Sequence, residues 1–250
     1  MNKAFYTGAS GLRAYQHNLD VIGHNITNSS TTGFKTTTPQ FRELVRTEMA
    51  LNKNREVGED GLVRAGNGVK AQHDDLNFTQ GSYQPTDYIL DFAIGGEGFF
   101  AVMNDDSSIE YTRNGSFDIS VEGDSMFLVD MSGRYVLDAA QQRIEIGKKP
   151  GTNIPDIDLV KPRLGIYSFI NPNGLIRTDG GSFIQSDNSG EPQLAQPGDY
   201  TVVQSTLERS NVELSQEMTN MIVGQKAYQF SAKVVTTADE IEQLVNSLRG

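Results

Sequence analysis

Apolar residues near the start of the chain recur at alternating steps of three and four along residues 3–28. This spacing is that of a heptad seam on one face of an α-helix, and polar or charged residues occupy the other faces. The segment 28–33 (NSSTTG) then brings turn-forming residues and a glycine suited to positive φ, so the helix is predicted to end there. The seam consists of Phe5, Gly8, Leu12, Tyr15, Leu19, Ile22 and Ile26.

A second, longer helix is predicted over residues 206–248, and it carries two apolar stripes. Two stripes place apolar surface on more than one side of a helix. A hairpin with the N-terminal helix would cover only one of them, so something else must cover the other. The first stripe comprises Leu214, Met218, Met221, Tyr228, Ala232 and Val235, with Gln225 as a polar interruption, and the second comprises Val223, Ala227, Phe230, Val234, Ile241, Leu244 and Leu248.

Between the two helices, from about residue 70 to 204, the pattern changes to short runs rich in β-branched and aromatic residues. Glycine, asparagine, aspartate or proline bounds each run, as is typical of strands in an all-β sandwich or an irregular barrel. The clearest runs are 89–94, 99–103, 127–129 and 164–170.

These patterns predict an α+β fold. The terminal α-helices are expected to form a coiled-coil-like domain, and a central, mostly antiparallel β domain is inserted between them. Residues 1–45 and 205–250 would make up the discontinuous helical domain, 46–70 a polar connector, and 71–204 the β domain.

Charge and composition narrow the function. The 250 residues carry a formal net charge of −11, which argues against nucleic-acid binding because that function needs clustered lysine and arginine. The chain has no cysteine, so disulfides, thiolate catalysis and thiolate metal sites are excluded. No run of about 18 apolar residues occurs, so direct insertion in a membrane is not expected. The first residues lack the apolar segment of a cleaved secretory signal.

No motif predicts a catalytic, cofactor-binding or metal-binding site. The segment 96–101 (GEGFFA) matches G-x-G-x-x-A, but a dinucleotide site needs a helix to follow, and a strand-like run follows instead. His17 and His24 are seven residues apart, too far along one helix for a two-histidine zinc site. Paired aspartates such as Asp105 and Asp106 lack the spacing of a calcium loop and are interpreted as solvated turn residues.

Several segments resemble the bacterial flagellar rod and hook protein family. Residues 10–28 (SGLRAYQHNLDVIGHNITN) followed by TTGFK at 31–35 closely resemble its N-terminal signature. The tail is similar over LERSNVEL (207–214), EMTNMI (217–222), QKAY (225–228) and TTADE (236–240). FTQG (78–81), LDFAIGGEGFF (90–100) and YTRNGSF (111–117) look like hallmarks of the family's middle domain. The length is similar to that of the distal rod proteins and their proximal-rod paralogues.

The resemblance implies a non-enzymatic structural subunit of the flagellar basal-body rod, without cofactors. Such a subunit assembles helically through its terminal helices into the axial drive shaft. Its implied partners are further copies of itself, other rod and hook subunits, and the flagellar export apparatus. Its implied location is the basal body in the cell envelope and periplasmic space, reached without a cleaved signal peptide. The expected subunit-packing residues are Leu12, Tyr15, Leu19, Ile22, Asn25, Ile26, Asn28, Gly33, Phe34, Asn211, Leu214, Met218, Met221, Ile222, Gln225 and Tyr228.

A secreted β-rich adhesin or carbohydrate-binding module, anchored by helical termini, is the main alternative. It requires a concave cluster of exposed aromatic side chains on the β domain, although the alternation of these residues suits a core better. The candidates for such a cluster are Tyr83, Tyr88, Phe99, Phe100 and Tyr111.

Overall fold

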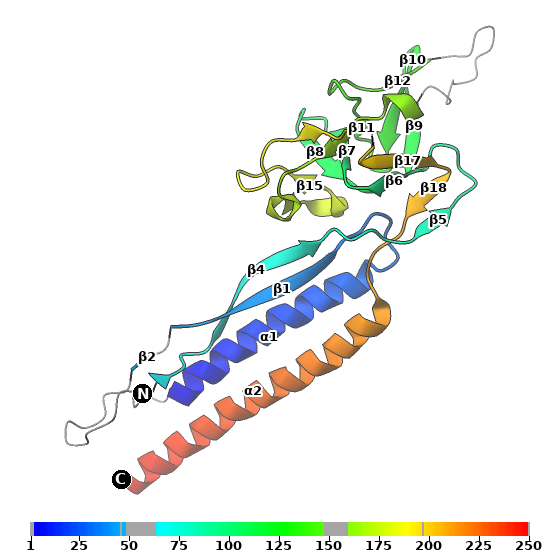
Figure 1. Cartoon of the computed structure of the whole chain (residues 1–250). Coiled ribbons are helices and arrows are strands. Elements are labelled where there is room, and N and C mark those ends of the chain that lie inside the picture. Colours follow the sequence, from blue (N-terminus) through cyan, green and yellow to red (C-terminus); the bar gives the residue numbers. More distant parts are fainter. Residues whose placement is uncertain (1–2, 46, 49–63, 148–159, 197, 250) are drawn as a thin grey trace. The chain divides into compact units, whose positions relative to one another are not determined.

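The computed structural model describes residues 3–45, 47–48, 64–147, 160–196 and 198–249, which belong to two compact units (Figure 1). The helical unit comprises Met1–Thr27, Thr37–Asp75 and Glu213–Gly250. The β unit comprises Asn28–Thr36 and Leu76–Val212. The chain is therefore α+β, with an antiparallel β unit inserted between two terminal helices, as the sequence predicts.

In the helical unit, α1 (Lys3–Thr27) and α2 (Leu214–Arg249) pack side by side, and a ribbon of β1 (Thr36–Glu43) and β4 (Val69–Asn77) lies along α1 (Figure 1). The backbone N–H of Val69 donates to Ser10 Oγ at 3.3 Å, and His17 Nε2 lies 2.8 Å from Asp74 Oδ1. These contacts attach the ribbon to one side of α1.

The helical unit also contains part of the predicted connector, residues 46–70. The short strands β2 (Thr47–Glu48) and β3 (Arg64–Ala65) pair with each other inside the predicted connector 46–70. Most of that connector, residues 46 and 49–63, lies outside the described residues. Among the helices that the structure describes, none is long and apolar enough to cross a lipid bilayer.

The β unit is built on a ten-stranded sheet. Its main path runs in the order β12-β10-β11-β7-β8-β15-β14, with β9, β13 and β16 attached at its sides, and the pairings are antiparallel. Two smaller ribbons, β6-β17 and β5-β18, complete the unit. The 3-10 turns η2 (Lys161–Arg163), η3 (Pro172–Gly174) and η4 (Asp179–Gly181) lie in its connections. The strands are β5 (Tyr83–Pro85), β6 (Phe92–Gly96), β7 (Phe99–Met103), β8 (Ile109–Thr112), β9 (Phe117–Glu122), β10 (Ser125–Asp130), β11 (Tyr135–Val136), β12 (Glu145–Ile146), β13 (Ile166–Ser168), β14 (Ile176–Arg177), β15 (Phe183–Ile184), β16 (Gln193–Leu194), β17 (Tyr200–Gln204) and β18 (Thr206–Glu208).

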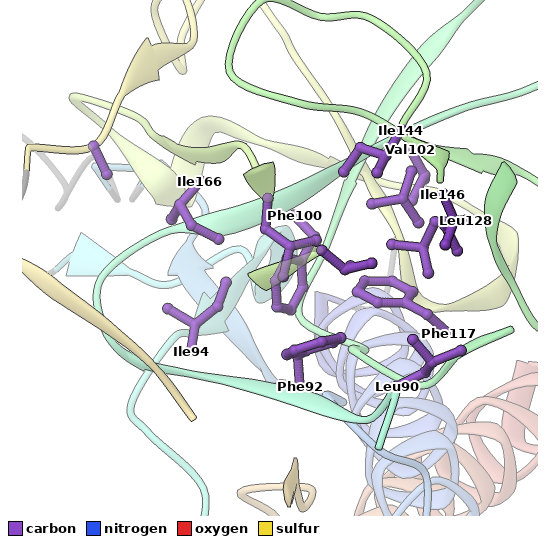
Figure 2. Packing of buried hydrophobic residues seen from close by; sticks show 14 residues of the cluster. Leu90, Phe92, Ile94, Phe100, Val102, Phe117, Leu128, Ile144, Ile146 and Ile166 are labelled. Carbon is purple, nitrogen blue, oxygen red and sulfur yellow. The ribbon is translucent and has the colours of Figure 1, made fainter. Parts of the chain in front are cut away.

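The central strand β7 is buried on both faces. Because successive side chains of a strand point to opposite faces, Phe100 and Val102 enter one hydrophobic core while Phe99 and Ala101 enter another. In the first core, the ring of Phe117 packs against that of Phe100 with centroids 5.1 Å apart (Figure 2). Burial on both faces explains why 99–103 is an unbroken apolar run rather than an alternating one.

The predicted G-x-G segment is a turn between two strands. Gly96 ends β6 with φ +95°, and Gly98 precedes β7 with φ +136°. A Cβ on Gly98 would lie 2.5 Å from Ile166 Cγ2, so a side chain there would meet both strain and a clash. These glycines serve the tight connection of β6 to β7, in agreement with the prediction that no helix follows.

A buried ion pair joins the segments where the chain enters and leaves the β unit. Lys35 Nζ lies 2.6 Å from Glu208 Oε1, and neither side chain is exposed. Arg113 Nη1 lies 3.4 Å from Glu208 Oε2, and the backbone N–H of Gly81 donates to Oε1 at 2.9 Å. Burial lowers the pKa of Lys35 and that of Arg113, and the negative charge of Glu208 opposes both shifts. Glu208 therefore contacts and compensates both buried cations.

Contacts of the segment around Glu208 explain why the C-terminal helix starts later than predicted and why residues 28–36 do not belong to the helical unit. Residues 206–213 were expected to be helical, but β18 pairs with β5 and α2 begins only at Leu214. The segment 28–36 also belongs to the β unit, since the N–H of Gly33 donates to the carbonyl of Glu208 at 2.8 Å. Gly33 has φ +69°, and a Cβ there would lie 2.5 Å from the backbone nitrogen of Asn114. Long-range pairing thus overrides the local apolar spacing of 206–213.

The buried side chain of Tyr111 should make the stability of the β unit depend on pH in the alkaline range. Its side chain is 2% exposed, and burial, helped by the neighbouring Tyr167, raises its pKa from 10.0 to about 12. A tyrosine with a raised folded-state pKa contributes stability that is complete below pH 10 and is lost as the pH rises through 12. This contribution amounts to at most about 2–3 kcal/mol.

We expect Tyr111→Phe to lose less stability than the wild type between pH 9 and pH 11.5, measured by urea unfolding followed by circular dichroism. Part of the loss should remain, because burial also raises the pKa of Tyr167. An equal loss in both proteins would show that Tyr111 ionises as freely in the folded unit as in the unfolded chain.

Candidate subunit-packing surface

The two terminal helices touch along a column of small and amide side chains. A Cβ on Gly11 would lie 3.1 Å from Ser231 Oγ, and a Cβ on Gly224 would lie 3.3 Å from Asn18 Nδ2. At 3.6 residues per turn, residues seven positions apart return to nearly the same side of a helix. The contact column, as we call it, therefore consists of Gly11, Asn18 and Asn25 in α1 and of Glu217, Gly224, Ser231 and Ala238 in α2.

Near the C-terminal end of α1, Asn25 hydrogen-bonds Glu217 of α2 in the contact column. Its Nδ2 donates to Glu217 Oε1 at 3.2 Å and to the carbonyl of Thr37 at 2.8 Å, while its Oδ1 accepts from the N–H of Thr37 at 3.1 Å. Asn25 is 1% exposed, and Glu217 is buried with its Oε2 lacking a hydrogen-bond partner. Asn25 therefore fixes the register of α1, α2 and β1 within one chain.

The predicted stripes flank the contact column, and some of their residues enter the contact: a Cβ on Gly8 would lie 2.8 Å from Val235 Cγ2 and 3.3 Å from Val234 Cγ1. In two antiparallel helices, residues that directly follow the contact column lie on one side of the pair, and residues that directly precede it lie on the other. Leu12 and Leu19 follow it in α1, as Met218 does in α2. Ser10 and His17 precede it in α1, where they contact the ribbon, and Phe230 precedes it in α2.

The first side forms what we call the two-helix face. Its α1 residues Leu12, Tyr15, Leu19 and Ile26 are only half-buried, and Met218 of α2 is 51% exposed. The predicted α1 seam and the first α2 stripe thus join into one apolar surface. It comprises Phe5, Leu12, Tyr15, Leu19 and Ile26 of α1 with Leu214, Met218, Met221, Gln225 and Tyr228 of α2.

The opposite side of α2 forms what we call the C-terminal face. Phe230 is 64% exposed and Leu248 is 81% exposed, although both are large and apolar. The contact-column register, in which Gly11 faces Ser231, places Lys3 opposite Asp239. Beyond Asp239, α2 has no described α1 residue opposite it. The face comprises Val223, Phe230, Val234, Ile241, Leu244 and Leu248.

Most of the expected packing residues lie in the two-helix face, and the others make contacts within the chain. Ile22 and Asn25 are buried in the helix pair, and Ile222 is exposed at the outer edge of the two-helix face. The remaining four, Asn28, Gly33, Phe34 and Asn211, lie in the β unit, whose own contacts hold them. Phe34 is buried beneath the Arg177 guanidinium, which lies 4.1 Å from its ring centroid, and Gly33 is likewise buried.

Two of the expected packing residues, Asn28 and Asn211, form side-chain hydrogen bonds within the chain. Asn28 Oδ1 accepts from Thr31 Oγ1 at 3.2 Å in the turn after α1. Asn211 lies in the loop before α2, where its Oδ1 accepts from the N–H of Thr36 at 2.7 Å and its Nδ2 donates to the carbonyl of Asn77 at 2.8 Å. The prediction that Asn211 lies on the terminal helix is therefore wrong.

Within the described residues, no three His, Asp or Glu side chains are grouped closely enough to hold a metal ion. The exposed His73 pairs with Asp75, at 3.0 Å. Of the proposed aromatic cluster, Phe99, Phe100 and Tyr111 are buried in the two cores. The surface that the helical unit offers is apolar, which is typical of proteins that work by binding other proteins.

Comparisons with known proteins agree with this class. Three family models match: "Flagella basal body rod protein" over residues 5–35, "Flagellar hook protein FlgE/F/G D1 domain" over 93–161, and "Flagellar basal body rod FlgEFG protein C-terminal" over 203–248. The chain is 33% identical to the flagellar basal-body rod proteins FlgG of Borreliella burgdorferi and Bacillus subtilis. The first alignment covers 100% of this chain and 99% of the relative, and the second covers 100% of both. It is 30% identical to the flagellar hook-basal body complex protein FlhP of Bacillus subtilis, again over 100% of both chains.

The chain belongs to the flagellar basal-body rod protein family. The family models match both terminal helices and the centre of the β unit, so the likeness extends to the two elements that carry the exposed faces.

Proposed function

We propose that this protein is a structural subunit of the bacterial flagellar basal-body rod, which assembles helically through its terminal helices into the axial drive shaft. The observation that carries the proposal is the pair of apolar faces on α1 and α2. Burying one large apolar side chain stabilises an assembly by about 1.5–3 kcal/mol, and each face offers several such side chains. A monomer leaves this stabilisation unused.

The arrangement of the faces favours a polymer over a closed dimer. The two-helix face and the C-terminal face differ in composition and lie on opposite sides of the contact column. A contact between unlike surfaces is heterologous, and it generates an open helical filament unless the rotation happens to close a ring. The same surfaces suit contacts with other axial proteins of the rod and hook, which share the terminal segments.

Location and export follow from the proposed role. We place the assembled subunit in the basal body within the cell envelope, including the periplasmic space, and we propose that it reaches that site through the flagellar export apparatus. The membership of the family supports both statements. A β-rich adhesin finds no support, since three of its five aromatic candidates are core residues.

Met218→Asp tests the proposal. Met218 is half-exposed in the monomer, so the variant should fold as the wild type does. In a polymer, the change would remove a buried apolar side chain and bury a carboxylate, at a combined cost of at least about 3 kcal/mol. The critical concentration for polymerisation should rise by more than about 100-fold, measured by sedimentation and electron microscopy.

Thr219→Asp is the matched control for this variant. Thr219 is the next residue, is exposed and lies outside the two-helix face, so the same charge there should leave polymerisation nearly unchanged. If Met218→Asp polymerises as readily as Thr219→Asp, the two-helix face is not an assembly surface.

A further inference from the structure

All of the sulfur in this chain is in methionine, because the sequence has seven methionines and no cysteine. Hydroperoxides oxidise a methionine thioether to a sulfoxide when they can reach the sulfur. Among the methionines that the structure describes, Met131 and Met218 are the most exposed, at 79% and 51%. Met103 and Met126 pack against the two cores of the β unit, and Met221 is half-buried. Oxidation of the folded chain should therefore begin at Met131 and Met218.

These two methionines lie in different surroundings. Met131 is in the turn after β10, where the N–H of Gly133 donates to the carbonyl of Asp130 at 3.0 Å. Met218 belongs to the two-helix face and directly follows the buried Glu217 of α2. The same chemical change should therefore have different consequences at the two positions.

We propose that Met218 is an oxidation site at which a hydroperoxide switches off assembly of the subunit. The inference rests on the proposed function, and it deepens that function by adding regulation at the same surface. The thioether sulfur attacks one oxygen of hydrogen peroxide, and the O–O bond breaks. The OH group on sulfur then gives its proton to the departing hydroxide, which leaves as water. Sulfur is oxidised by two electrons, the peroxide is reduced, and the product is methionine sulfoxide.

The sulfoxide should leave the monomer folded. Because Met218 is about half-exposed, the added oxygen can remain in water while the rest of the side chain keeps its place. The buried contacts of the helix pair, such as the hydrogen bond between Asn25 and Glu217, do not involve this side chain. Oxidation should therefore act on assembly and not on folding.

Polymerisation, in contrast, would transfer the sulfoxide oxygen from water into an apolar contact. The side chains of Leu214, Met221 and Ile222, on neighbouring turns of α2, contain no hydrogen-bond donor. The hydroxyl of Ser215 already donates to Glu213 Oε1 at 3.2 Å. Burying a polar acceptor without a donor is unfavourable, so the oxidised subunit should assemble poorly.

Peroxide treatment of three full-length proteins tests this inference. They are the wild type, Met218→Leu and Met131→Leu, since leucine is apolar and close to methionine in volume. Each would be treated with hydrogen peroxide, freed of oxidant with catalase, and compared with an untreated sample. Mass spectrometry of peptides would give the sulfoxide fraction at each methionine, and sedimentation would give the critical concentration for polymerisation.

We expect peroxide to raise the critical concentration of the wild type and of Met131→Leu by at least about 10-fold. The critical concentration of Met218→Leu should change by less than about two-fold. Circular dichroism should show the same helix content before and after treatment in all three. Normal polymerisation of a wild type that is fully oxidised at Met218, or an equal loss in Met218→Leu, would overturn the inference and leave the proposed function intact.

A second measurement uses the wild-type chain alone, in case Met218→Leu assembles poorly before treatment. Methionine sulfoxide reductases for both sulfoxide epimers, with a dithiol as the reductant, should restore polymerisation as the sulfoxide at Met218 is reduced. A block that persists after Met218 has been fully reduced would overturn the inference. If the untreated wild-type chain forms no polymer with itself or on purified rods, the proposed function fails, and the inference fails with it.

Discussion

Removal of α2 should abolish polymerisation and leave the β unit intact. A chain that ends at Glu213 keeps all of the β unit, which extends to Val212, but lacks the C-terminal face and half of the two-helix face. Without α2, the contact column of α1 loses its partner as well. We expect no sedimenting polymer at concentrations about 100-fold above the wild-type threshold. The melting temperature of the β unit should change by less than about 2 °C.

A chain that is truncated further distinguishes loss of polymerisation from general unfolding. A chain that ends at Ser205 also loses β18, and with it the carboxylate that compensates Lys35 and Arg113. Its β unit should lose cooperative melting, or melt far below the chain that ends at Glu213. Polymerisation by the chain that ends at Glu213 would contradict the assignment of assembly to the terminal helices.

Glu208→Leu should destabilise the β unit more than any substitution at an exposed position. The change removes the carboxylate that contacts both buried cations, Lys35 and Arg113. Breaking a buried ion pair from one side costs about 3–5 kcal/mol. The melting temperature should therefore fall by about 10 °C or more, measured by calorimetry on the full-length chain.

Lys35→Met provides the matched comparison. It removes one of the two cations, and Glu208 retains Arg113 and the N–H of Gly81 as partners. The loss of stability should be clearly smaller than in Glu208→Leu. Equal losses, or a loss below about 1 kcal/mol for Glu208→Leu, would show that the network does not hold the entry and exit segments together.

The helices could be predicted from the sequence because their signal is local. Apolar steps of three and four located α1 almost to the residue, as Lys3–Thr27 against the expected 3–28. The same signal extended α2 too far upstream. Residues 206–208 are a strand because they pair with β5, more than a hundred residues earlier, and local spacing carries no information on such pairing.

Strands were predicted where both faces are buried, as in β7, but their order in the sheet was not. Short strands such as β11 and β14 contain two residues each, which is too few for any periodicity. The Lys35–Glu208 pair was missed for a related reason. A lysine within TTGFK gives no sign of burial, and its partner is 173 positions away.

The sequence located the large apolar side chains of the two helices, but it did not show how α1 and α2 contact each other. The first α2 stripe does meet α1, since a Cβ on Gly8 would lie 2.8 Å from Val235 Cγ2. The small residues Gly224 and Ser231 are also part of the contact, and small residues attract no attention in a search for apolar periodicity. Their seven-residue spacing, repeated from Glu217 to Ala238, is the signal that could have identified it.

The central claim is that the terminal helices, and not the β unit, build the polymer. Hydrogen exchange measured residue by residue on monomer and polymer tests it most directly. The account predicts that α1 and α2 gain protection together on assembly, most strongly in the two-helix face and at the exposed end of α2. The core strands of the β unit should exchange equally slowly in both states. Polymers in which the helices exchange as fast as in the monomer, while strands of the β unit become newly protected, would contradict the account.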